Sequence, residues 1–160
     1  MVKKYVFGTP IETDAVVKEI KETSWKDDIF QKEGNVFHYL LKPDELVYGL
    51  GENVRGINKR GWRYVSNCSD NPNHCEHTNS LYGAHNFIMM GDGVSETYGL
   101  FVDTPGTVTF DVGYTDIDRL IIAMENENYK IYLIEGQTYQ DVVREFREMI
   151  GRSYIAPKWA

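Results

Sequence analysis

Six short segments with the composition of β-strands follow one another between residues 35 and 136, and turn residues separate them. They are NVFHYLL, LVYGL, ETYGLFVDT, GTVTFDVGY, DRLIIAMEN and YKIYLIEG. Pro105-Gly106 and the stretch Glu125–Asn128 separate neighbouring segments at the spacing of a hairpin, and PDE forms a turn after the first segment. A series of this kind predicts a mainly β protein, an antiparallel β-sandwich built largely from hairpins, rather than a βαβ fold.

Two segments carry helical signals. In TYQDVVREFREMIG, Thr138 is the expected N-cap, Asp141 stands at the third helical position, and Gly151 ends the helix. The apolar face of this C-terminal helix consists of Val142, Val143, Phe146, Met149 and Ile150. A short N-terminal helix is predicted over residues 12–23, where Ala15, Val16, Val17 and Ile20 alternate with Lys and Glu.

The chain of 160 residues has the size of one domain, and we treat 1–160 as a single unit. Its scattered charges sum to −7, which disfavours binding to nucleic acid or to an anionic membrane. The start, MVKKYVFGTPIETD, lacks the apolar region of a signal peptide. Two cysteines, Cys68 and Cys75, indicate reduced thiols rather than a disulfide framework. We therefore expect a cytoplasmic protein with no nucleic-acid or membrane partner.

The glycines of YGLGE have part of the spacing of a nucleotide-binding loop. The third glycine and the following helix of that motif are missing, so a strand end at which two backbones approach closely is the favoured interpretation. Glu52 then has two possible roles, a local polar contact or a contact with a ligand.

The stretch HCEH, with Cys68 upstream, brings potential metal ligands together in sequence at His74, Cys75 and His77. Structural zinc sites usually take two pairs of ligands, and only one cluster is present here. A polar loop without metal is the favoured interpretation, and we expect no metal and no cofactor.

Glycosidic or similar acid–base chemistry requires two carboxylates in a common cleft. The candidates are Asp70, Asp92, Asp103 and Asp111, but their spacing brings no pair together, and turn roles suit most of them. No nucleophile elbow accompanies the serines and histidines. The residues by themselves therefore predict no catalytic site in this chain.

Several longer stretches, in order along the chain, carry a family resemblance. They are VYGLGE at 47–52, NKRGWRYVSNCSDNP at 58–72, SLYGAHNFIMM at 80–90, YGLFVDTPGTVTFDVG at 98–113, YKIYLIEG at 129–136 and GRSYIAPKWA at the end. From about Phe37 to Ala160 the chain resembles the N-terminal domain of glycoside hydrolase family 31, which contains α-glucosidases and α-xylosidases. The tail departs from the family pattern, because it has Ala156-Pro157 where Pro-Pro is usual.

This resemblance implies a galactose-mutarotase-like β-sandwich that ends before a TIM-type catalytic barrel. The barrel supplies both catalytic aspartates in that family, so this chain alone is expected to hydrolyse no α-glucoside. Its implied partners are its own barrel and an α-glucoside oligosaccharide, and a bare barrel-facing surface would promote self-association of the isolated domain. The resemblance also implies that Asp70 binds substrate, on a loop that reaches the leaving-group side of the cleft.

Two functions from different classes remain open at this stage. The favoured one is a non-catalytic N-terminal domain of a retaining α-glucosidase-type hydrolase that packs on the barrel and supplies a loop to the cleft. The alternative is a free-standing sandwich that binds carbohydrate or acts as a mutarotase. Glucose or xylose preference, linkage and oligomeric state would be determined mainly by the barrel.

Overall fold

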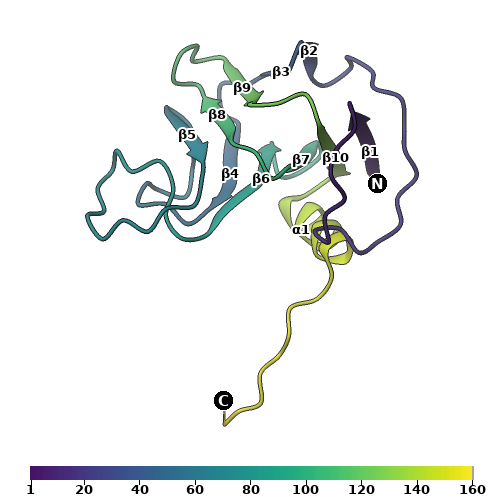
Figure 1. Cartoon of the computed structure of the whole chain (residues 1–160). Coiled ribbons are helices and arrows are strands. Elements are labelled where there is room, and N and C mark those ends of the chain that lie inside the picture. The colour runs from purple at the N-terminus through teal and green to yellow at the C-terminus, as the bar shows by residue number, and fades with distance from the viewer. Residues whose placement is uncertain (160) are drawn as a thin grey trace.

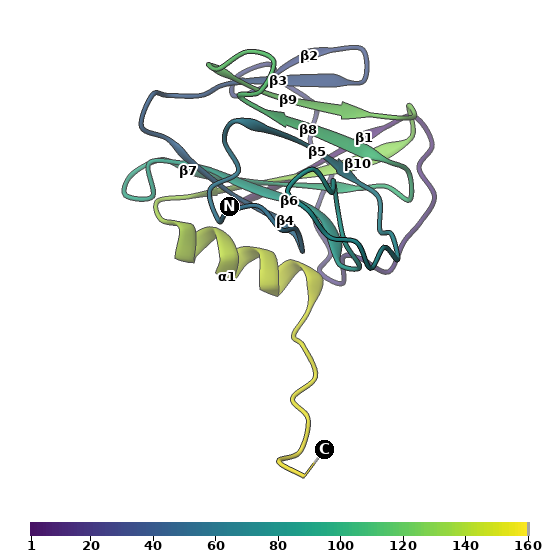
Figure 2. The same cartoon turned by 90° about the vertical axis from the view of Figure 1, so that its left-hand side faces the viewer.

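The computed structural model describes residues 1–159 and consists of two antiparallel sheets packed face to face, with one helix against the outer side of one sheet (Figure 1 and Figure 2). The first sheet has the order β1 (Val2–Phe7), β10 (Tyr129–Gly136), β7 (Thr97–Asp103), β6 (Ala84–Gly91), β4 (Leu46–Gly51). The second has the order β2 (Gln31–Glu33), β3 (Val36–Leu40), β9 (Arg119–Met124), β8 (Val108–Val112), β5 (Trp62–Ser66). The predicted mainly β, sandwich fold is confirmed. Ala160, the last residue of the tail motif, lies outside the described residues.

The core between the two sheets is rich in aromatic side chains. The ring of Phe37 meets Trp25 and Phe7 edge to face, at centroid distances of 4.9 and 5.7 Å. Tyr129 packs on Phe7 at 4.9 Å. Such pairs add directional contacts to the burial of large apolar surface, so they fix how the two sheets face each other.

All six predicted segments form strands, β3, β4 and β7–β10, whereas β1, β2, β5 and β6 were not predicted, and the hairpin prediction is wrong for three of the connections. Pro105-Gly106 joins β7 to β8, Glu125–Asn128 joins β9 to β10, and the PDE turn joins β3 to β4. The two strands of each pair lie in different sheets, so these turns cross from one sheet to the other. A turn sequence encodes reversal of the chain but not hydrogen bonding between the strands that it joins. The antiparallel neighbours that are consecutive in sequence are β2–β3, β6–β7 and β8–β9.

Helix α1 (Tyr139–Ile150) covers the outer face of the first sheet. It begins at the predicted capping box, in which Thr138 and Asp141 exchange side-chain and backbone hydrogen bonds, and Gly151 follows its last residue. Phe146 stacks on Phe87 with ring centroids 3.8 Å apart. β10 is consequently buried on both faces, which explains why YKIYLIEG is apolar almost throughout.

The predicted N-terminal helix over residues 12–23 is wrong. This segment runs as irregular chain beside the C-terminal end of α1 (Figure 2). Val16 and Ile20 pack against the cluster under α1, while the backbone N–H groups of Val17 and Lys18 donate to the Met149 carbonyl at 3.0 and 3.2 Å. β-branched residues have low helix propensity. Here their burial and these capping bonds replace the hydrogen bonds of a helix.

Among residues 1–159, α1 is the only helix, and at 12 residues it is too short and too polar to cross a membrane.

Candidate functional site

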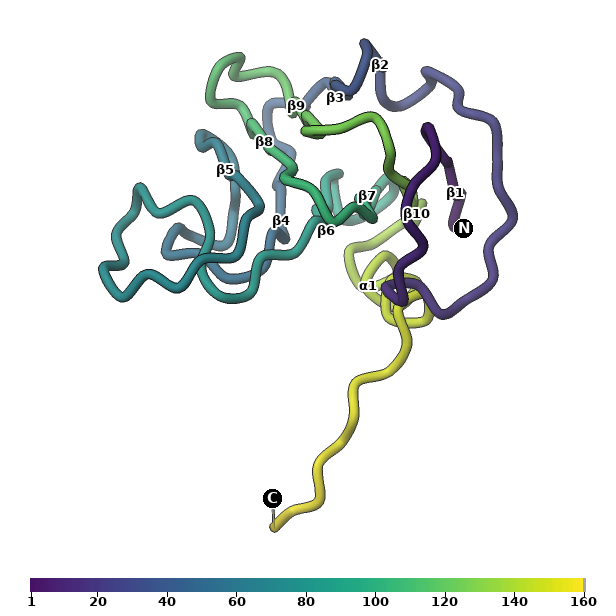
Figure 3. The backbone as a smooth tube through the Cα atoms, viewed as in Figure 1, coloured from purple at the N-terminus to yellow at the C-terminus, as the bar shows by residue number. Residues whose placement is uncertain are grey.

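A long irregular loop, residues 67–83, joins β5 to β6 and extends beyond the edge of the sandwich as the blue-green loop at the left of Figure 3. It contains Asp70 and the HCEH stretch. Because β5 is an edge strand and β6 lies next to the edge strand β4, the loop begins and ends near a border of the molecule where a second surface could approach.

The neck of this loop is fixed by hydrogen bonds. The Ser80 hydroxyl accepts from the backbone N–H of Asn67 at 3.1 Å and donates to its carbonyl at 2.5 Å. The backbone N–H of Ser69 donates to the Leu81 carbonyl at 3.1 Å. Ser80 and Leu81 are buried. The residues just beyond the neck therefore start from a defined position.

Asp70 follows the neck directly, and its side chain is exposed. Within residues 1–159 its carboxylate accepts no hydrogen bond and forms no ion pair. The turn beside Pro72 is made by Asn71 instead, whose Oδ1 accepts from the backbone N–H of Asn73 at 2.9 Å. The turn role that the sequence offered to Asp70 thus belongs to Asn71, and both oxygens of the Asp70 carboxylate are available to an outside partner.

The loop also encloses an open cavity of about 450 Å³. Its lining is almost entirely polar: Val65, Asn67, Ser69, Asn71, Asn73, Cys75, His77, Thr78, Asn79 and Ser80. Amide and hydroxyl groups of this kind both donate and accept hydrogen bonds, as sugar hydroxyls do. Asp70 lies beside this cavity in sequence but is not one of its lining residues.

The potential metal ligands of HCEH do not converge. The His74 ring packs against Tyr82 at 6.0 Å and the His77 ring against Trp62 at 6.1 Å. The Thr78 hydroxyl beside Cys75 lowers the pKa of that exposed thiol. Over the described range 1–159, no three His, Cys, Asp or Glu side chains form a group that could hold a metal ion.

YGLGE forms the irregular end of β4. Gly49, Leu50 and Gly51 all have positive φ, at 122°, 68° and 72°, and the register with β6 shifts there. A Cβ atom on Gly51 would collide with the Gly83 carbonyl, so the predicted close approach of two backbones is observed. Glu52 follows, and its Oε2 accepts from the backbone N–H of Gly83 at 3.2 Å while its own N–H donates to the Gly83 carbonyl at 2.7 Å. Glu52 thus ties β4 to the base of the 67–83 loop.

The other candidate carboxylates are held by local partners. Asp92 accepts from the Ser95 hydroxyl and from three backbone N–H groups of the same turn, and these bonds hold its pKa far below the ordinary value. Buried Asp103 accepts from the Thr13 hydroxyl at 2.7 Å. Asp111 pairs with Arg63 at 3.0 Å. Each therefore has a local structural partner.

The basic residues of NVRGINKRG were not among the predicted site residues, yet they organise the region next to the loop. Lys59 is buried, and its ammonium donates to the Asn53 side chain at 2.8 Å and to the Gly56 carbonyl at 2.9 Å. Arg60 donates to the carbonyls of Lys42, Pro43, Glu45 and Ile117. Arg55 reaches the loop itself. The sequence feature that could have indicated this role is a basic run followed by the alternating aromatic residues of β5.

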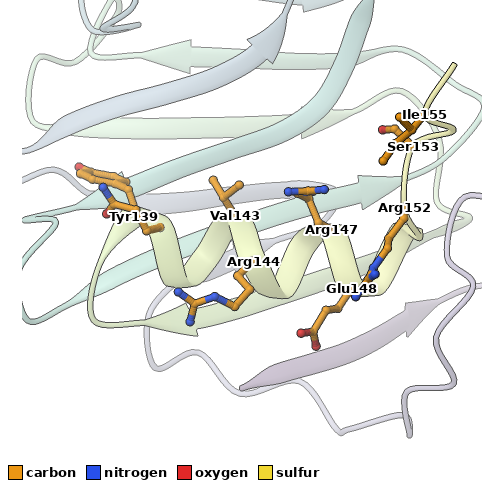
Figure 4. A pocket seen from close by; sticks show the side chains of 9 residues that line it. Tyr139, Val143, Arg144, Arg147, Glu148, Arg152, Ser153 and Ile155 are labelled. Carbon is orange, nitrogen blue, oxygen red and sulfur yellow. The ribbon is translucent and has the colours of Figure 1, made fainter. Parts of the chain in front are cut away.

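A second surface lies on the solvent side of α1 and along the chain that follows it. A cavity of about 740 Å³ lies there, lined by Tyr139, Gln140, Val143, Arg144, Arg147, Glu148, Arg152, Ser153 and Ile155. Figure 4 shows the side chains that line it. Beyond it the tail leaves the sandwich as extended chain (Figure 1). Tyr154, Ile155 and Trp159 are 85, 90 and 88% exposed. We call this surface, α1 with residues 151–159, the α1–tail surface.

Sequence comparison relates the chain to the N-terminal part of glycoside hydrolases. Residues 8–111 match the family described as the glycosyl hydrolase 31 N-terminal galactose mutarotase-like domain. The α-glucosidase of Saccharolobus solfataricus is 31% identical over 117 residues, which are 72% of this chain and 17% of that protein. The α-xylosidase XylQ of Lactiplantibacillus pentosus is 29% identical over 119 residues, 73% of this chain and 14% of that protein. The chain therefore spans only a small part of the length of these relatives.

Comparison of structures agrees at the level of the fold. A family 31 dextranase from Flavobacterium johnsoniae, solved with isomaltotriose, superposes with a TM-score of 0.69 at 24% identity over 84% of this chain and 16% of that one. The cycloalternan-degrading enzyme of Trueperella pyogenes, solved with isomaltose, gives a TM-score of 0.74 at 21% identity over 85% of this chain and 22% of that one. The two-layer sandwich and the ordered family motifs lead to one conclusion: the chain belongs to the galactose-mutarotase-like N-terminal domains of glycosyl hydrolase family 31.

Proposed function

We propose that this chain is the non-catalytic N-terminal domain of a retaining α-glucosidase-type hydrolase, in which it packs on the catalytic barrel and supplies the 67–83 loop to the substrate cleft. The observation that carries the substrate role is the unpartnered Asp70 carboxylate just beyond a neck fixed by hydrogen bonds. The full-length relatives include an α-glucosidase and an α-xylosidase, which supports an α-glycoside oligosaccharide as the substrate class.

The α1–tail surface is the proposed contact with the barrel. Its tail exposes an isoleucine and a tryptophan almost completely, and such side chains gain most from burial against another apolar surface. Arginines 144, 147 and 152 line the same cavity in a chain whose net charge is −7, so acidic groups are expected on the facing surface.

Asp70 is suited to hold the leaving-group sugar. An ionised carboxylate accepts hydrogen bonds from two neighbouring hydroxyls at once, and charge-assisted bonds are stronger than neutral ones. We propose a role in binding rather than in bond cleavage, because a retaining enzyme needs two carboxyl groups about 5–5.5 Å apart and the candidates Asp92, Asp103 and Asp111 are each held by local partners.

The test is Asp70→Asn in the complete enzyme. Loss of a charge-assisted hydrogen bond is expected to cost about 1.5–3 kcal/mol, or roughly ten- to a hundredfold in kcat/KM for disaccharides. Aryl glucosides, whose leaving group lacks the sugar hydroxyls, should lose much less. Asp44→Asn is the matched control, because Asp44 is also exposed but lies in the turn between β3 and β4.

Equal losses on both substrate types, or a drop in melting temperature large enough to explain them, would contradict the proposal. Acceleration of glucose anomer interconversion by the isolated chain would favour the alternative of a mutarotase-like sandwich.

We also propose a cytoplasmic location. Both cysteines are free and exposed in the 67–83 loop, and exposed thiols of this kind persist in a reducing compartment.

A further inference from the structure

Arg55 lies in the connection between β4 and β5, and its guanidinium rests on two aromatic rings of β5. The guanidinium carbon is 4.4 Å from the Trp62 ring centroid and 4.9 Å from that of Tyr64. Contacts of this kind favour a planar cation over an aromatic face. The two rings belong to a paired strand, so they give the guanidinium a rigid base.

From this base Arg55 reaches in two directions. Its Nε donates to the backbone carbonyl of Glu76 at 2.6 Å, and its Nη1 donates to the carbonyl of Arg63 at 2.6 Å. Arg63 is on β5, whereas Glu76 is in the outer half of the 67–83 loop. A single side chain thus connects the loop to a strand of the second sheet.

The part of the loop that Arg55 holds is a compact turn. The backbone N–H of Thr78 donates to the Cys75 carbonyl at 3.0 Å, which closes the turn around Glu76. The His77 ring lies against the same Trp62 that supports Arg55. No carboxylate of residues 1–159 pairs with Arg55, and its donors are directed to backbone carbonyls, which do not titrate.

The loop is therefore fixed at two places, the neck at 67–69 and 80–81 and the turn at 75–78. Residues 70–74, which include Asp70, span the distance between them. Without the Arg55 contact, this span would be restrained mainly by the Asn71 turn and by the His74 ring against Tyr82, and polar loops with few apolar contacts are mobile. The Arg55 contact adds a further fixed point at Glu76.

We propose that Arg55 is a positioning residue, which fixes the 75–78 turn on β5 and thereby presents Asp70 to the substrate. This inference rests on the proposed function of Asp70. A side chain outside the loop thus determines where part of the loop lies.

The first test measures amide hydrogen exchange in the 160-residue chain. Arg55→Ala is expected to speed exchange in residues 74–79 by about tenfold or more, with β6 and β8 unchanged. Trp62→Leu removes one of the two rings under Arg55 and the ring against which His77 packs. It should affect the same residues, and the double variant should add little. Arg63→Ala is the matched control, because its side chain lies over Tyr114 and pairs with Asp111, on another part of the surface.

Arg55→Lys separates charge from geometry. Lysine keeps the positive charge near Trp62 but lacks the fork that serves two carbonyls together, so it should restore slow exchange only in part. Unchanged exchange in Arg55→Ala, full restoration by lysine, or an equal rise throughout the chain would each overturn the proposal.

The second test uses the complete enzyme. Arg55→Ala should raise KM for disaccharides about tenfold with little change in kcat, and it should add nothing to Asp70→Asn. If Asp70→Asn raises KM and Arg55→Ala does not, the positioning role is overturned and the proposed function stands. If Asp70→Asn has no effect, the proposed function fails, while the exchange data still decide whether Arg55 fixes the turn.

Discussion

Leu50 shows how much a single residue can be constrained by its neighbours. It is 5% exposed, and its φ of 68° lies in the left-handed region that leucine rarely adopts. Burial of its side chain in the core offsets a backbone strain of about 1 kcal/mol. This backbone conformation produces the sharp bend that places Glu52 against Gly83 at the base of the loop.

Substitution at this position should reverse the usual order of alanine and glycine. Leu50→Ala is expected to lower the free energy of unfolding by about 2–5 kcal/mol through the lost side chain. Leu50→Gly should be about 1 kcal/mol more stable than Leu50→Ala, because glycine adopts positive φ without strain. At Val47, a buried residue of the same strand with ordinary φ, glycine should be the less stable of the two. The measurement is urea unfolding of the four variants. If Leu50→Gly were less stable than Leu50→Ala, the proposed backbone strain at this position would be refuted.

Asp111 connects stability to pH. Burial raises the pKa of its carboxyl, but hydrogen bonds from Thr115, Arg63 and Tyr114 outweigh that effect and hold the pKa below the ordinary value. A carboxyl whose pKa is lower in the folded state stabilises the fold above its unfolded pKa of about 3.9, and this stabilisation is lost as the pH falls through the folded pKa. Asp111→Asn should therefore lower stability at pH 7 by about 2 kcal/mol and flatten the loss of stability below about pH 4.

The measurement is the free energy of unfolding between pH 2 and 8, with Asp44→Asn as control. Parallel curves for Asp111→Asn and the unsubstituted chain would show that Asp111 does not contribute to the acid sensitivity.

At the scale of elements, six of the ten strands within residues 1–159 could be predicted from the sequence, and the pairing of strands could not. Alternating apolar residues reveal that a segment is half-buried, as in GTVTFDVGY, where Val108, Phe110 and Val112 all point into the core. Which sheet the next strand joins depends on packing across the core, for example of Phe37 on Trp25, and no local pattern encodes that contact. The helix predicted over residues 12–23 was wrong for the same reason, namely that tertiary packing decided the outcome. Its apolar residues pack against the cluster under α1 and do not form the face of a helix.

Helix α1 was predictable because its signals are local. The capping box makes one more prediction: Thr138→Ala removes a side-chain acceptor from the Asp141 N–H and should cost about 1 kcal/mol. Gln140→Ala, in the same turn and exposed, should be close to neutral. Thermal unfolding of both variants provides the comparison, and equal stabilities would show that the cap contributes nothing measurable.

At the scale of the whole molecule, the candidate site was only partly visible in the sequence. Asp70 was predicted as a site residue from the family resemblance. Only the structure shows that its carboxylate has no partner and that Asn71 makes the turn in its place. Arg55 could not be found in advance, since a carbonyl 21 residues away in sequence is contacted only after β5 and the loop have folded.

The α1–tail surface predicts self-association of this chain at high concentration. Three large apolar side chains of the tail are at least 85% exposed, and burial between two copies would remove them from water. Sedimentation velocity should show dimers that disappear in the double variant Ile155→Ser, Trp159→Ser. Ile57→Ser, at an exposed residue of the β4–β5 connection, should leave them unchanged. A strict monomer at millimolar concentration would contradict the prediction.

The contact between residues 17–18 and the end of α1 has a mechanical consequence. The same N-terminal segment continues to Thr23, whose backbone N–H donates to the Lys4 carbonyl in β1 at 2.7 Å. A force applied along the tail acts first on Gly151. This residue lies close to the Met149 carbonyl, which accepts hydrogen bonds from the backbone N–H groups of Val17 and Lys18. It is therefore transmitted both through α1 to the middle of the first sheet and through residues 17–23 to the strand at its edge. Any neighbour that pulls on the tail pulls on the first strand of the sandwich at the same time.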